Sequence, residues 1–259
     1  MGRTFCSSDW HGAGELANKI LGFLKPDDTL YFIGDAVDRG ADGFEIFQKL
    51  ISDPRVKFIR GNHEQMMADS IIYAWEDVHN LNCDCSDKYE DWYYNGGEAT
   101  AKDLLNLTKD EIYDIQSKIY HMPTELIYNS PKGHTIIMEH AGYTPFDLPH
   151  RTHDPLWDRN HFHDIWRGGE SQVYLVHGHT PVQYLKFRYG YYGDSPLTQE
   201  EWKYKREWVK NLPCTFKPTI IRYCEGHKFD IDMCTAASDR IALLDLDTFE
   251  EIYFDKENI

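Results

Sequence analysis

The fold is decided by the stretch Thr29-Leu30-Tyr31-Phe32-Ile33-Gly34-Asp35-Ala36-Val37-Asp38-Arg39-Gly40. Its first part, Thr29 to Ile33, is a short run of β-branched and aromatic side chains, which is typical of a buried strand. Two aspartates and an arginine follow the end of this run. In α/β sheets, ligands and catalytic groups gather beyond the carboxyl ends of the strands. The stretch therefore predicts a strand that delivers Asp35 and Asp38 to a site.

Four further apolar runs end in the same way, and stretches with helical periodicity follow several of the runs. Because the ends of neighbouring strands converge, side chains that are distant in sequence are expected to meet at one site. The alternation of strands and helices predicts an α/β fold. The runs and the metal-capable residues after them are Thr4 to Cys6 with Asp9 and His11, Val56 to Ile59 with Asn62 and His63, Thr135 to Met138 with His140, and Val173 to Val176 with His177 and His179. The helical stretches are Glu15 to Leu24, Phe44 to Ile51 and Glu64 to Trp75.

The types of these side chains indicate a class of metal. Imidazole, carboxylate and amide oxygen without thiolate suit manganese, iron or zinc better than a structural cysteine-based zinc site. Two metal ions require a shared anionic ligand and enough ligands on each side, and this set meets both needs. Two ions held about 3.5 to 4 Å apart can activate a water and stabilise the charge of phosphoryl oxygens. The sequence thus predicts two divalent metal ions as cofactors, and manganese is expected to support activity in vitro.

Five sequence blocks resemble the signature blocks of the PPP superfamily of metallophosphoesterases. The resemblance implies a calcineurin-like α/β fold with a central β-sandwich flanked by helices. The bacterial and phage serine/threonine phosphatases are the most similar members, because Leu156-Trp157-Asp158-Arg159 resembles their segment between the two late histidines. The blocks are Asp9-Trp10-His11-Gly12, Gly34 to Gly40, Gly61-Asn62-His63-Glu64, His140-Ala141-Gly142 and Gly178-His179-Thr180.

The resemblance also implies a role for each matching residue. Asp35 would bridge the two metal ions. His63 would be the general acid, oriented by Asp38, and Arg39 and Arg159 would bind the phosphoryl oxygens. The implied ligands are Asp9, His11 and Asp35 for one ion, and Asp35, Asn62, His140 and His179 for the other.

Some residues depart from the family pattern. Ser8 and Ala141 stand where glycine is common, and Trp10 occupies a position that is usually small or aliphatic. None of these three is an implied ligand. Met233-Cys234 replaces a frequent Thr-Gly pair, which affects the expected substrate specificity and leaves the chemistry intact.

Several other candidates have a structural interpretation that we favour. His177 is expected to support or pack against the site instead of binding metal. His150, His153, His161 and His163 fall in a polar loop, where one of them could contact substrate. Asn95-Gly96-Gly97-Glu98 is interpreted as a helix start, although a glycine pair can also bind phosphate. The remaining candidates are Trp92, Tyr93 and Tyr94, interpreted as helix packing, and Cys83 and Cys85 with His79, interpreted as a loop that does not match a zinc pattern.

We expect one catalytic domain over residues 1–259, because layered α/β folds often reach this length as single units. A helical insertion is predicted at about 75–121 and a surface excursion at about 184–217. A hairpin is predicted from Thr124 to Tyr128 and Thr135 to Met138, with later strands at Ile241 to Leu246 and Glu250 to Phe254.

The composition limits the partners. A net charge of −16 argues against nucleic acid, since binding to it depends on neutralising phosphates with Lys and Arg. There is no long apolar segment and no signal peptide, which predicts a cytoplasmic protein that does not use a membrane. Six cysteines are sparse in 259 residues and are expected to be reduced. The sequence does not indicate an oligomeric state.

Three functions are compatible with these residues. The favoured one is hydrolysis of phosphoserine and phosphothreonine in proteins, with a phosphorylated protein or peptide as the partner. A dinucleoside polyphosphate hydrolase, for example one acting on diadenosine tetraphosphate, would use the same metal blocks with a different substrate groove. A catalytically inactive module that binds phosphorylated ligands is the third, and the complete set of ligands with His63 and Asp38 argues against it.

Overall fold

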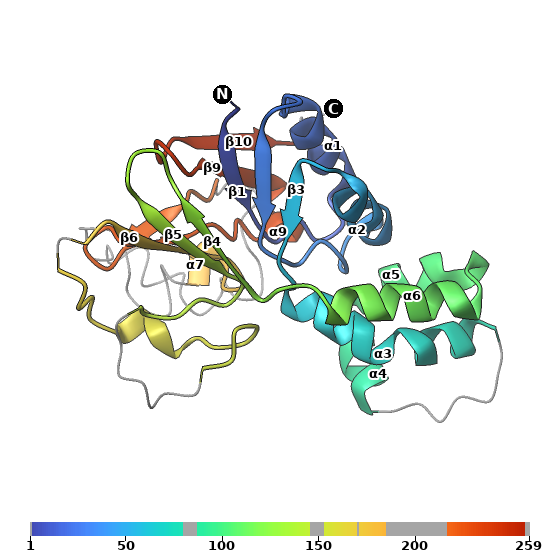
Figure 1. Cartoon of the computed structure of the whole chain (residues 1–259). Coiled ribbons are helices and arrows are strands. Elements are labelled where there is room, and N and C mark those ends of the chain that lie inside the picture. Colours follow the sequence, from blue (N-terminus) through green and yellow to red (C-terminus); the bar gives the residue numbers. More distant parts are fainter. Residues whose placement is uncertain (1, 80–86, 146–152, 170, 185–216, 257–259) are drawn as a thin grey trace.

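A computed structural model describes residues 2–79, 87–145, 153–169, 171–184 and 217–256 (Figure 1). Cys83, Cys85, His150 and residues 185–216 of the expected surface excursion lie outside these ranges.

Two mixed sheets form the centre of the molecule (Figure 1). The first has the strand order β10-β9-β1-β2-β3 and the second the order β4-β5-β6-β8-β7. Strands β1, β2 and β3 are parallel, as are β5, β6 and β8, so each sheet has an edge at which parallel strands end together. The strands are β1 (Thr4–Ser7), β2 (Thr29–Phe32), β3 (Val56–Phe58), β4 (Glu125–Asn129), β5 (Thr135–Glu139), β6 (Val173–His177), β7 (Ile221–Tyr223), β8 (Lys228–Asp230), β9 (Arg240–Asp245) and β10 (Glu251–Asp255).

The alternation of side chains along the strands builds two apolar layers. Phe5 and Leu30 pack with residues of α1 (Gly14–Phe23) and α2 (Gly43–Ser52) on the outer face of the first sheet. Their neighbours Cys6 and Tyr31 point the other way and pack with residues of the second sheet. Since successive side chains of a strand face opposite sides, each short apolar run fills both layers at once. The predicted β-sandwich flanked by helices is confirmed.

The chain between β3 and β4 is helical and projects from the sandwich (Figure 1). Thr108 and Glu111 form a capping box at the start of its last helix, as the Thr-x-x-Glu spacing predicts. The elements are α3 (Asn62–Val78), α4 (Asp87–Trp92), a π-helical turn at Tyr93–Gly97, α5 (Glu98–Lys102), a 3-10 turn at Asp103–Asn106 and α6 (Lys109–Tyr120). Two short helices, α7 (Val182–Tyr184) and α9 (Thr235–Ser238), lie among the strands.

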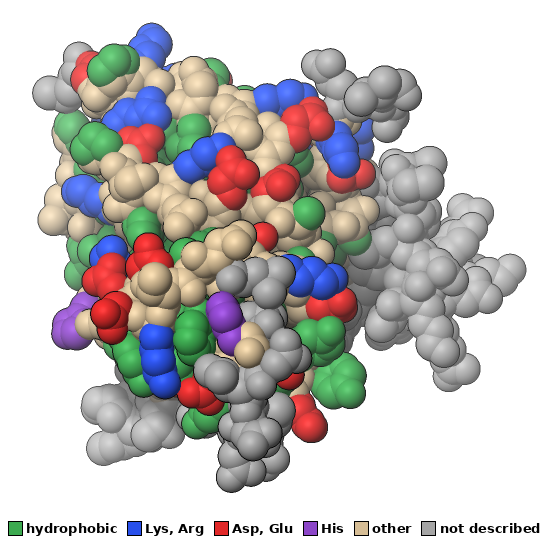
Figure 2. Space-filling view, turned by 90° about the vertical axis from the view of Figure 1, so that its right-hand side faces the viewer, with side chains coloured by type: hydrophobic (Ala, Val, Ile, Leu, Met, Phe, Trp, Pro, Cys, Tyr) green, Lys and Arg blue, Asp and Glu red, His purple; other side chains and the backbone are tan. Residues whose placement is uncertain are grey.

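The surface carries both signs of charge. Figure 2 shows acidic and basic side chains interspersed on the face that lies at the right of Figure 1. Among the described residues, no helix has both the length and the apolar content needed to cross a bilayer.

The edge strand β10 is fixed to β9 by an ion pair. The buried Arg240 donates from Nε to Asp255 Oδ1 at 2.6 Å and from Nη2 to Oδ2 at 3.0 Å. A third bond joins its Nη1 to the carbonyl of Pro218 at 3.0 Å. The bonds from Arg240 lower the pKa of Asp255 to about 2.

This pair yields a stability prediction. Asp255→Asn should lower the free energy of unfolding at pH 7 by about 1 to 2 kcal/mol. This is the contribution of a hydrogen-bonded charge pair, about 1 to 2 kcal/mol when reduced because Asp255 is partly exposed. The folded pKa lies below the unfolded value of about 3.9, so the contribution of the carboxylate is complete above pH 5 and is lost as the pH falls through about 4 to 2. Urea unfolding of both proteins across this range should show their difference shrinking with acid. An unchanged difference down to pH 2 would contradict this assignment.

Candidate active site

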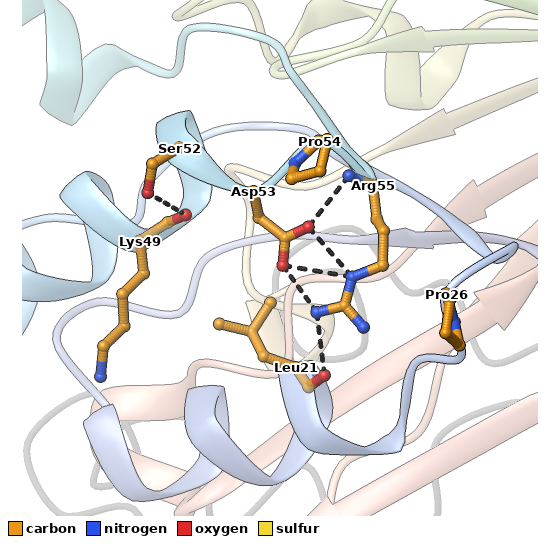
Figure 3. A pocket seen from close by; sticks show the side chains of 7 residues that line it. All are labelled: Leu21, Pro26, Lys49, Ser52, Asp53, Pro54 and Arg55. Carbon is orange, nitrogen blue, oxygen red and sulfur yellow. Dashed lines mark hydrogen bonds and ion pairs between the residues drawn. The ribbon is translucent and has the colours of Figure 1, made fainter.

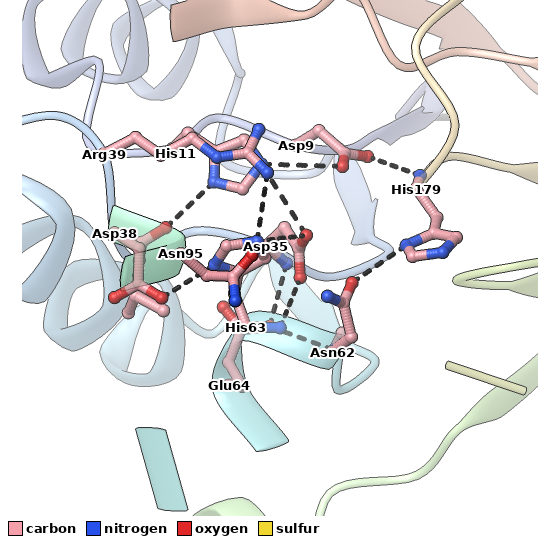
Figure 4. A network of polar contacts seen from close by, with 12 residues as sticks. Asp9, His11, Asp35, Asp38, Arg39, Asn62, His63, Glu64, Asn95 and His179 are labelled. Carbon is pink, nitrogen blue, oxygen red and sulfur yellow. Dashed lines mark hydrogen bonds and ion pairs between the residues drawn. The ribbon is translucent and has the colours of Figure 1, made fainter. Parts of the chain in front are cut away.

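The implied metal ligands meet where parallel strands of both sheets end. Asp9 and His11 follow β1, Asp35 follows β2, and Asn62 begins α3 just after β3. The second sheet contributes the histidines that follow β5 and β6. All six implied ligands are buried, with at most 6% of any one exposed: Asp9, His11, Asp35, Asn62, His140 and His179. Figure 4 labels five of them around a common centre, all except His140.

The turns that carry these side chains have an unusual backbone. Asp9, His11, Asp35, Asp38 and His179 all have positive φ, between 41° and 71°, and Arg39 has φ 65°. Residues other than glycine rarely adopt this left-handed conformation, which costs on the order of 1 to 3 kcal/mol for each residue. Strain of this kind persists where the surrounding structure holds the chain for a function. Six of the eleven described non-glycine residues with positive φ lie in the loops after β1, β2 and β6, which carry implied site residues.

One half of the site is formed by Asn62, His140 and His179. The Nδ1 of His140 lies 2.8 Å from the carbonyl oxygen of Ile33, which can only accept, so the hydrogen is on Nδ1 and Nε2 has a lone pair. That lone pair faces Asn62 Oδ1 at 2.8 Å, and His179 Nδ1 faces the same oxygen at 2.9 Å. Burial lowers the pKa of His140 to about 3, so its Nε2 is unprotonated near neutral pH and two acceptors, His140 Nε2 and Asn62 Oδ1, face each other. A metal cation bound here would satisfy both atoms.

The other half is formed by Asp9 and His11. The Nδ1 of His11 lies 3.0 Å from the carbonyl oxygen of Val37, which leaves Nε2 free to bind a cation. This Nε2 is 3.8 Å from Asp9 Oδ1 and 3.6 Å from Asp35 Oδ2. Ligand atoms around one metal ion lie about 3 to 3.5 Å apart at metal–ligand distances near 2.1 Å, so these groups need to close by only a few tenths of an ångström.

Asp35 joins the two halves. Its Oδ2 faces His11, while its Oδ1 is 3.5 Å from His140 Nε2. Burial, and then the charge of Asp9, raises the pKa of Asp35 well above its usual value. Two clusters of donor atoms that could each hold an ion share this carboxylate: His11, Asp35 and His63, and Asp9, Asp35 and His140. The residues present therefore fit two divalent ions bridged by Asp35.

Ser8, which departs from the family pattern, has a clear role. Its hydroxyl donates to Asp9 Oδ2, and the backbone N–H of His179 donates to the same oxygen at 3.1 Å. These bonds occupy Oδ2 and leave Oδ1 on the side of His11. Ser8 therefore helps to fix the rotamer of Asp9, an implied metal ligand.

His63 and Asp38 form the expected dyad. His63 Nδ1 lies 2.7 Å from Asp38 Oδ2, and His63 Nε2 lies 3.1 Å from Nη2 of Arg39. A guanidinium can only donate, so His63 accepts on Nε2 and donates from Nδ1 to the carboxylate. Burial lowers the pKa of His63, while the bond to Asp38 acts in the opposite direction.

Arg159 reaches the same site from the loop between the two late histidines. Its Nε donates to Thr180 Oγ1 at 3.0 Å, and its Nη2 lies 3.4 Å from the carbonyl oxygen of His179. The ring of Trp157 meets that of His179 edge-on, with centroids 5.8 Å apart. The structure therefore places Arg159 beside His179, one of the implied metal ligands.

The helical insertion makes hydrogen bonds to Asp38, and the sequence did not predict this contact. Trp92 Nε1 donates to Asp38 Oδ2 at 2.9 Å, and Thr100 Oγ1 donates to Oδ1 at 2.7 Å. The backbone N–H of Asp38 donates to Thr100 Oγ1 at 3.0 Å. Trp92 does pack in the apolar cluster, as expected, but packing is only part of its role.

The glycine pair at 96–97 allows this approach. A Cβ on Gly97 would lie 2.5 Å from the Trp92 indole, and one on Gly96 would lie 2.8 Å from Arg39 Cγ. The carbonyl oxygen of Gly96 accepts from the backbone N–H of Arg39 at 3.0 Å. A helix does start at Glu98, as interpreted, and the spacing Trp92-x-x-x-Gly96-Gly97-x-x-Thr100 is the signal that could have revealed the contact with Asp38.

Two cavities differ in their relation to this site. The larger, about 560 Å³, lies between the ends of α1 and α2, where Arg55 is bonded to Asp53 and to the carbonyl of Leu21 (Figure 3). It contains none of the implied ligands. The other, about 430 Å³, starts at His11 and Arg39 and extends outward to Lys256. Of these two cavities, this second one is lined by an implied metal ligand, His11, and by Arg39.

Comparison with known families agrees with this geometry. Residues 2–210 match the family model of calcineurin-like phosphoesterases. The chain belongs to this family. A match over most of its length includes every implied ligand, so this phosphoesterase is expected to use a pair of metal ions as the family does.

Solved structures share the fold of this phosphoesterase. A "putative diadenosine tetraphosphatase" aligns with a TM-score of 0.54 at 15% identity, covering 99% of this chain and 95% of the other. A metallophosphoesterase from Sphaerobacter thermophilus aligns with a TM-score of 0.51 at 12% identity, covering 99% and 88%. At these identities the similarity establishes the fold and leaves the substrate open.

The bridging role of Asp35 can be tested by metal analysis. Asp35→Asn should reduce the bound metal from two ions to one or fewer per chain, because a neutral amide cannot serve as the shared anion. Mass spectrometry of metals after gel filtration measures this ratio. Asp42→Asn, a change at an exposed carboxylate, is the matched control and should retain both ions. Two tightly bound ions in Asp35→Asn would contradict the bridge.

The link between the insertion and Asp38 can be tested at Thr100. Thr100→Val removes the bond to a charged acceptor and should lower kcat about tenfold with the metal content unchanged, since such bonds contribute about 1.5 to 3 kcal/mol. Thr100→Ser keeps the hydroxyl and should restore most of the activity. Steady-state kinetics on a phosphothreonine peptide, whose leaving group needs a proton, would show the difference. Equal activity of the valine and serine variants would exclude a role for this contact.

Proposed function

We propose that this phosphoesterase hydrolyses phosphoserine and phosphothreonine in proteins. One observation carries the proposal: a buried carboxylate shared by two sets of metal ligands lies next to a histidine–carboxylate dyad and two arginines. This combination can bind a phosphate monoester and protonate its leaving group. It also argues against an inactive binding module, which would have no need for the dyad.

Two ions held by the six ligands would neutralise the phosphoryl oxygens and lower the pKa of a water in the site. Asp9, His11 and Asp35 would hold one ion, and Asp35, Asn62, His140 and His179 the other. The strained turns hold these donors in place before any ion binds, so little reorganisation accompanies binding.

Arg39 and Arg159 would bind the phosphoryl oxygens through their forked guanidinium groups. Arg39 also sets the state of His63 before substrate binds, because it donates to His63 Nε2. A phosphoryl group that takes over this donor would leave Nε2 free to carry a proton. The negative charge of Asp38 at Nδ1 stabilises the resulting imidazolium.

The protonated His63 would then deliver its proton to the leaving alkoxide. Its Nε2 lies 3.9 Å from Asp35 Oδ2, so the ring faces the bridged centre. A general acid positioned in this way contributes roughly 100- to 10,000-fold to the rate. Serine and threonine alkoxides are poor leaving groups, and their expulsion benefits from such a proton.

The substrate class is decided by comparing two substrates with manganese present. We expect kcat/KM for a phosphothreonine peptide to exceed that for diadenosine tetraphosphate at least tenfold. The reverse order would overturn the proposal in favour of a dinucleoside polyphosphate hydrolase. A metal-loaded protein that turns over neither substrate, nor para-nitrophenyl phosphate, would favour the binding module.

The general acid is tested by His63→Asn. This variant should lose about 100-fold or more in kcat on the peptide while retaining both metal ions, because the lost group transfers a proton and does not hold the ions. The loss should be much smaller for para-nitrophenyl phosphate, whose leaving group needs little protonation. An equal loss on both substrates would argue that His63 acts in another step.

A further inference from the structure

The outer face of the second sheet carries a buried polar cluster that the proposed reaction does not use. Its members are at most 5% exposed, and we refer to them as the buried histidine network: His161, His177, Tyr223 and Lys228. Three of them come from the neighbouring strands β6, β7 and β8, and the fourth from the 3-10 turn Asn160–His163 that covers this face.

The hydrogen bonds fix the state of His161. Its Nε2 lies 3.0 Å from the carbonyl oxygen of Ala141, so Nε2 must donate. Its Nδ1 then accepts, and the Nζ of Lys228 donates to it at 3.2 Å. Lys228 also donates to the carbonyl oxygen of His161 at 3.2 Å and to Thr144 Oγ1 at 2.5 Å. Burial lowers the pKa of His161 well below its usual value, which agrees with a neutral ring.

His177 is fixed in a similar way. Its Nδ1 lies 3.1 Å from the carbonyl oxygen of Gly178, and its Nε2 lies 2.7 Å from the hydroxyl of Tyr223. Since the carbonyl only accepts, Nδ1 donates to it and Nε2 accepts from the tyrosine. The rings of His161 and His177 meet edge-on with centroids 5.0 Å apart, so the two histidines pack against each other.

Both ends of the network touch the backbone beside a metal ligand. Ala141 directly follows His140, and Gly178 directly precedes His179. The N–H of Gly178 also donates to the carbonyl oxygen of His140 at 3.0 Å, so the two loops are joined. The network therefore restrains the chain on either side of this joint.

The side chains pack tightly around these contacts. A Cβ added to Gly142, which has φ 85°, would lie 2.9 Å from His177 Cβ and 3.2 Å from His161 Cε1. Both rings therefore lie against the backbone of the loop that begins at His140.

A purely structural layer would not need these side chains. On the opposite face of the same strands, Val176 and Phe229 form an ordinary apolar layer. Burying a lysine and two imidazoles is costly unless every group is hydrogen-bonded, and a fully connected network makes a region rigid. The polar face differs from the apolar one because its His161 and His177 bond the carbonyl groups of Ala141 and Gly178, next to His140 and His179.

We propose that the buried histidine network positions His140 and His179 for metal binding, with His161, His177, Tyr223 and Lys228 as positioning residues. The inference rests on the proposed metal-dependent function. Groups that orient metal ligands typically change metal affinity or activity about 10- to 100-fold when they are lost.

The test is a cobalt(II) titration of the full chain, followed by visible absorption. Tyr223→Phe removes one hydroxyl and should weaken the binding step that belongs to Asn62, His140 and His179 about 10- to 100-fold. The step that belongs to Asp9 and His11 should change little. His140→Ala, which removes a ligand, identifies which step is which.

Two further variants separate positioning from general stability. Tyr174→Phe removes the hydroxyl of another buried tyrosine of this sheet, one that bonds Gln172 away from the site, and should leave both binding steps unchanged. Lys228→Met removes the donor to His161 and should weaken the same step as Tyr223→Phe. Thermal unfolding of the metal-free proteins shows whether each variant is folded.

The outcomes are distinct. Selective weakening of one step in folded Tyr223→Phe and Lys228→Met supports the proposal. Two unchanged steps, or equal weakening of both, would overturn it while leaving the metal centre intact. A wild-type chain that binds fewer than two cobalt ions would instead overturn the metal-dependent function on which the inference rests.

Discussion

The structure depends on one constraint, which is the burial of the Asp35 carboxylate beside that of Asp9. Burial and mutual repulsion both oppose ionisation of this pair, so bound cations would favour the ionised carboxylates. Hydrogen bonds from the backbone hold Asp35 in place. The N–H groups of Asp35 and Ala36 each donate to a carboxylate oxygen of Glu64 at 2.8 Å. A third bond, 2.9 Å from the N–H of Gly61, ties the loop after β2 to the start of α3. Glu64 therefore fixes the backbone of Asp35, the proposed bridging ligand.

Both sheets contribute to the centre: Asn62 follows β3 of the first sheet and lies with the two histidines that follow strands of the second. The first sheet supplies Asp9, His11 and Asp35, with the helical insertion bonded to Asp38 through Trp92 and Thr100. The second supplies the late histidines, with a polar layer behind their loops. Changes in the insertion are therefore expected to affect proton transfer, and changes behind the second sheet are expected to affect metal binding. This division gives a physical basis for separating the two effects by mutation.

Much of the fold and the site could be predicted from the sequence. The runs at Thr29 to Ile33 and Val173 to Val176 are buried strands because their side chains fill both apolar layers, and the metal-capable residues after them do converge. Two short strands, β7 and β8, were not anticipated, since three-residue strands such as Lys228–Asp230 carry too little pattern to detect. The roles of Trp92 and Tyr223 were missed for a different reason. Each acts through a single hydrogen bond to a partner more than 40 residues away, and no local pattern records such a pairing.

The sequence by itself determined the strand order along the chain, the identity of the donor groups and hence the class of metal chemistry. These properties follow from residue type and from the rule that parallel strands end at a common edge. Only the tertiary structure decided which oxygen of Asp35 faces which half of the site, which nitrogen of each histidine is free, and which distant groups hold Asp38 and the loop of His179. These depend on hydrogen-bond direction and on left-handed turns, and both are set by packing between segments that are far apart in the chain.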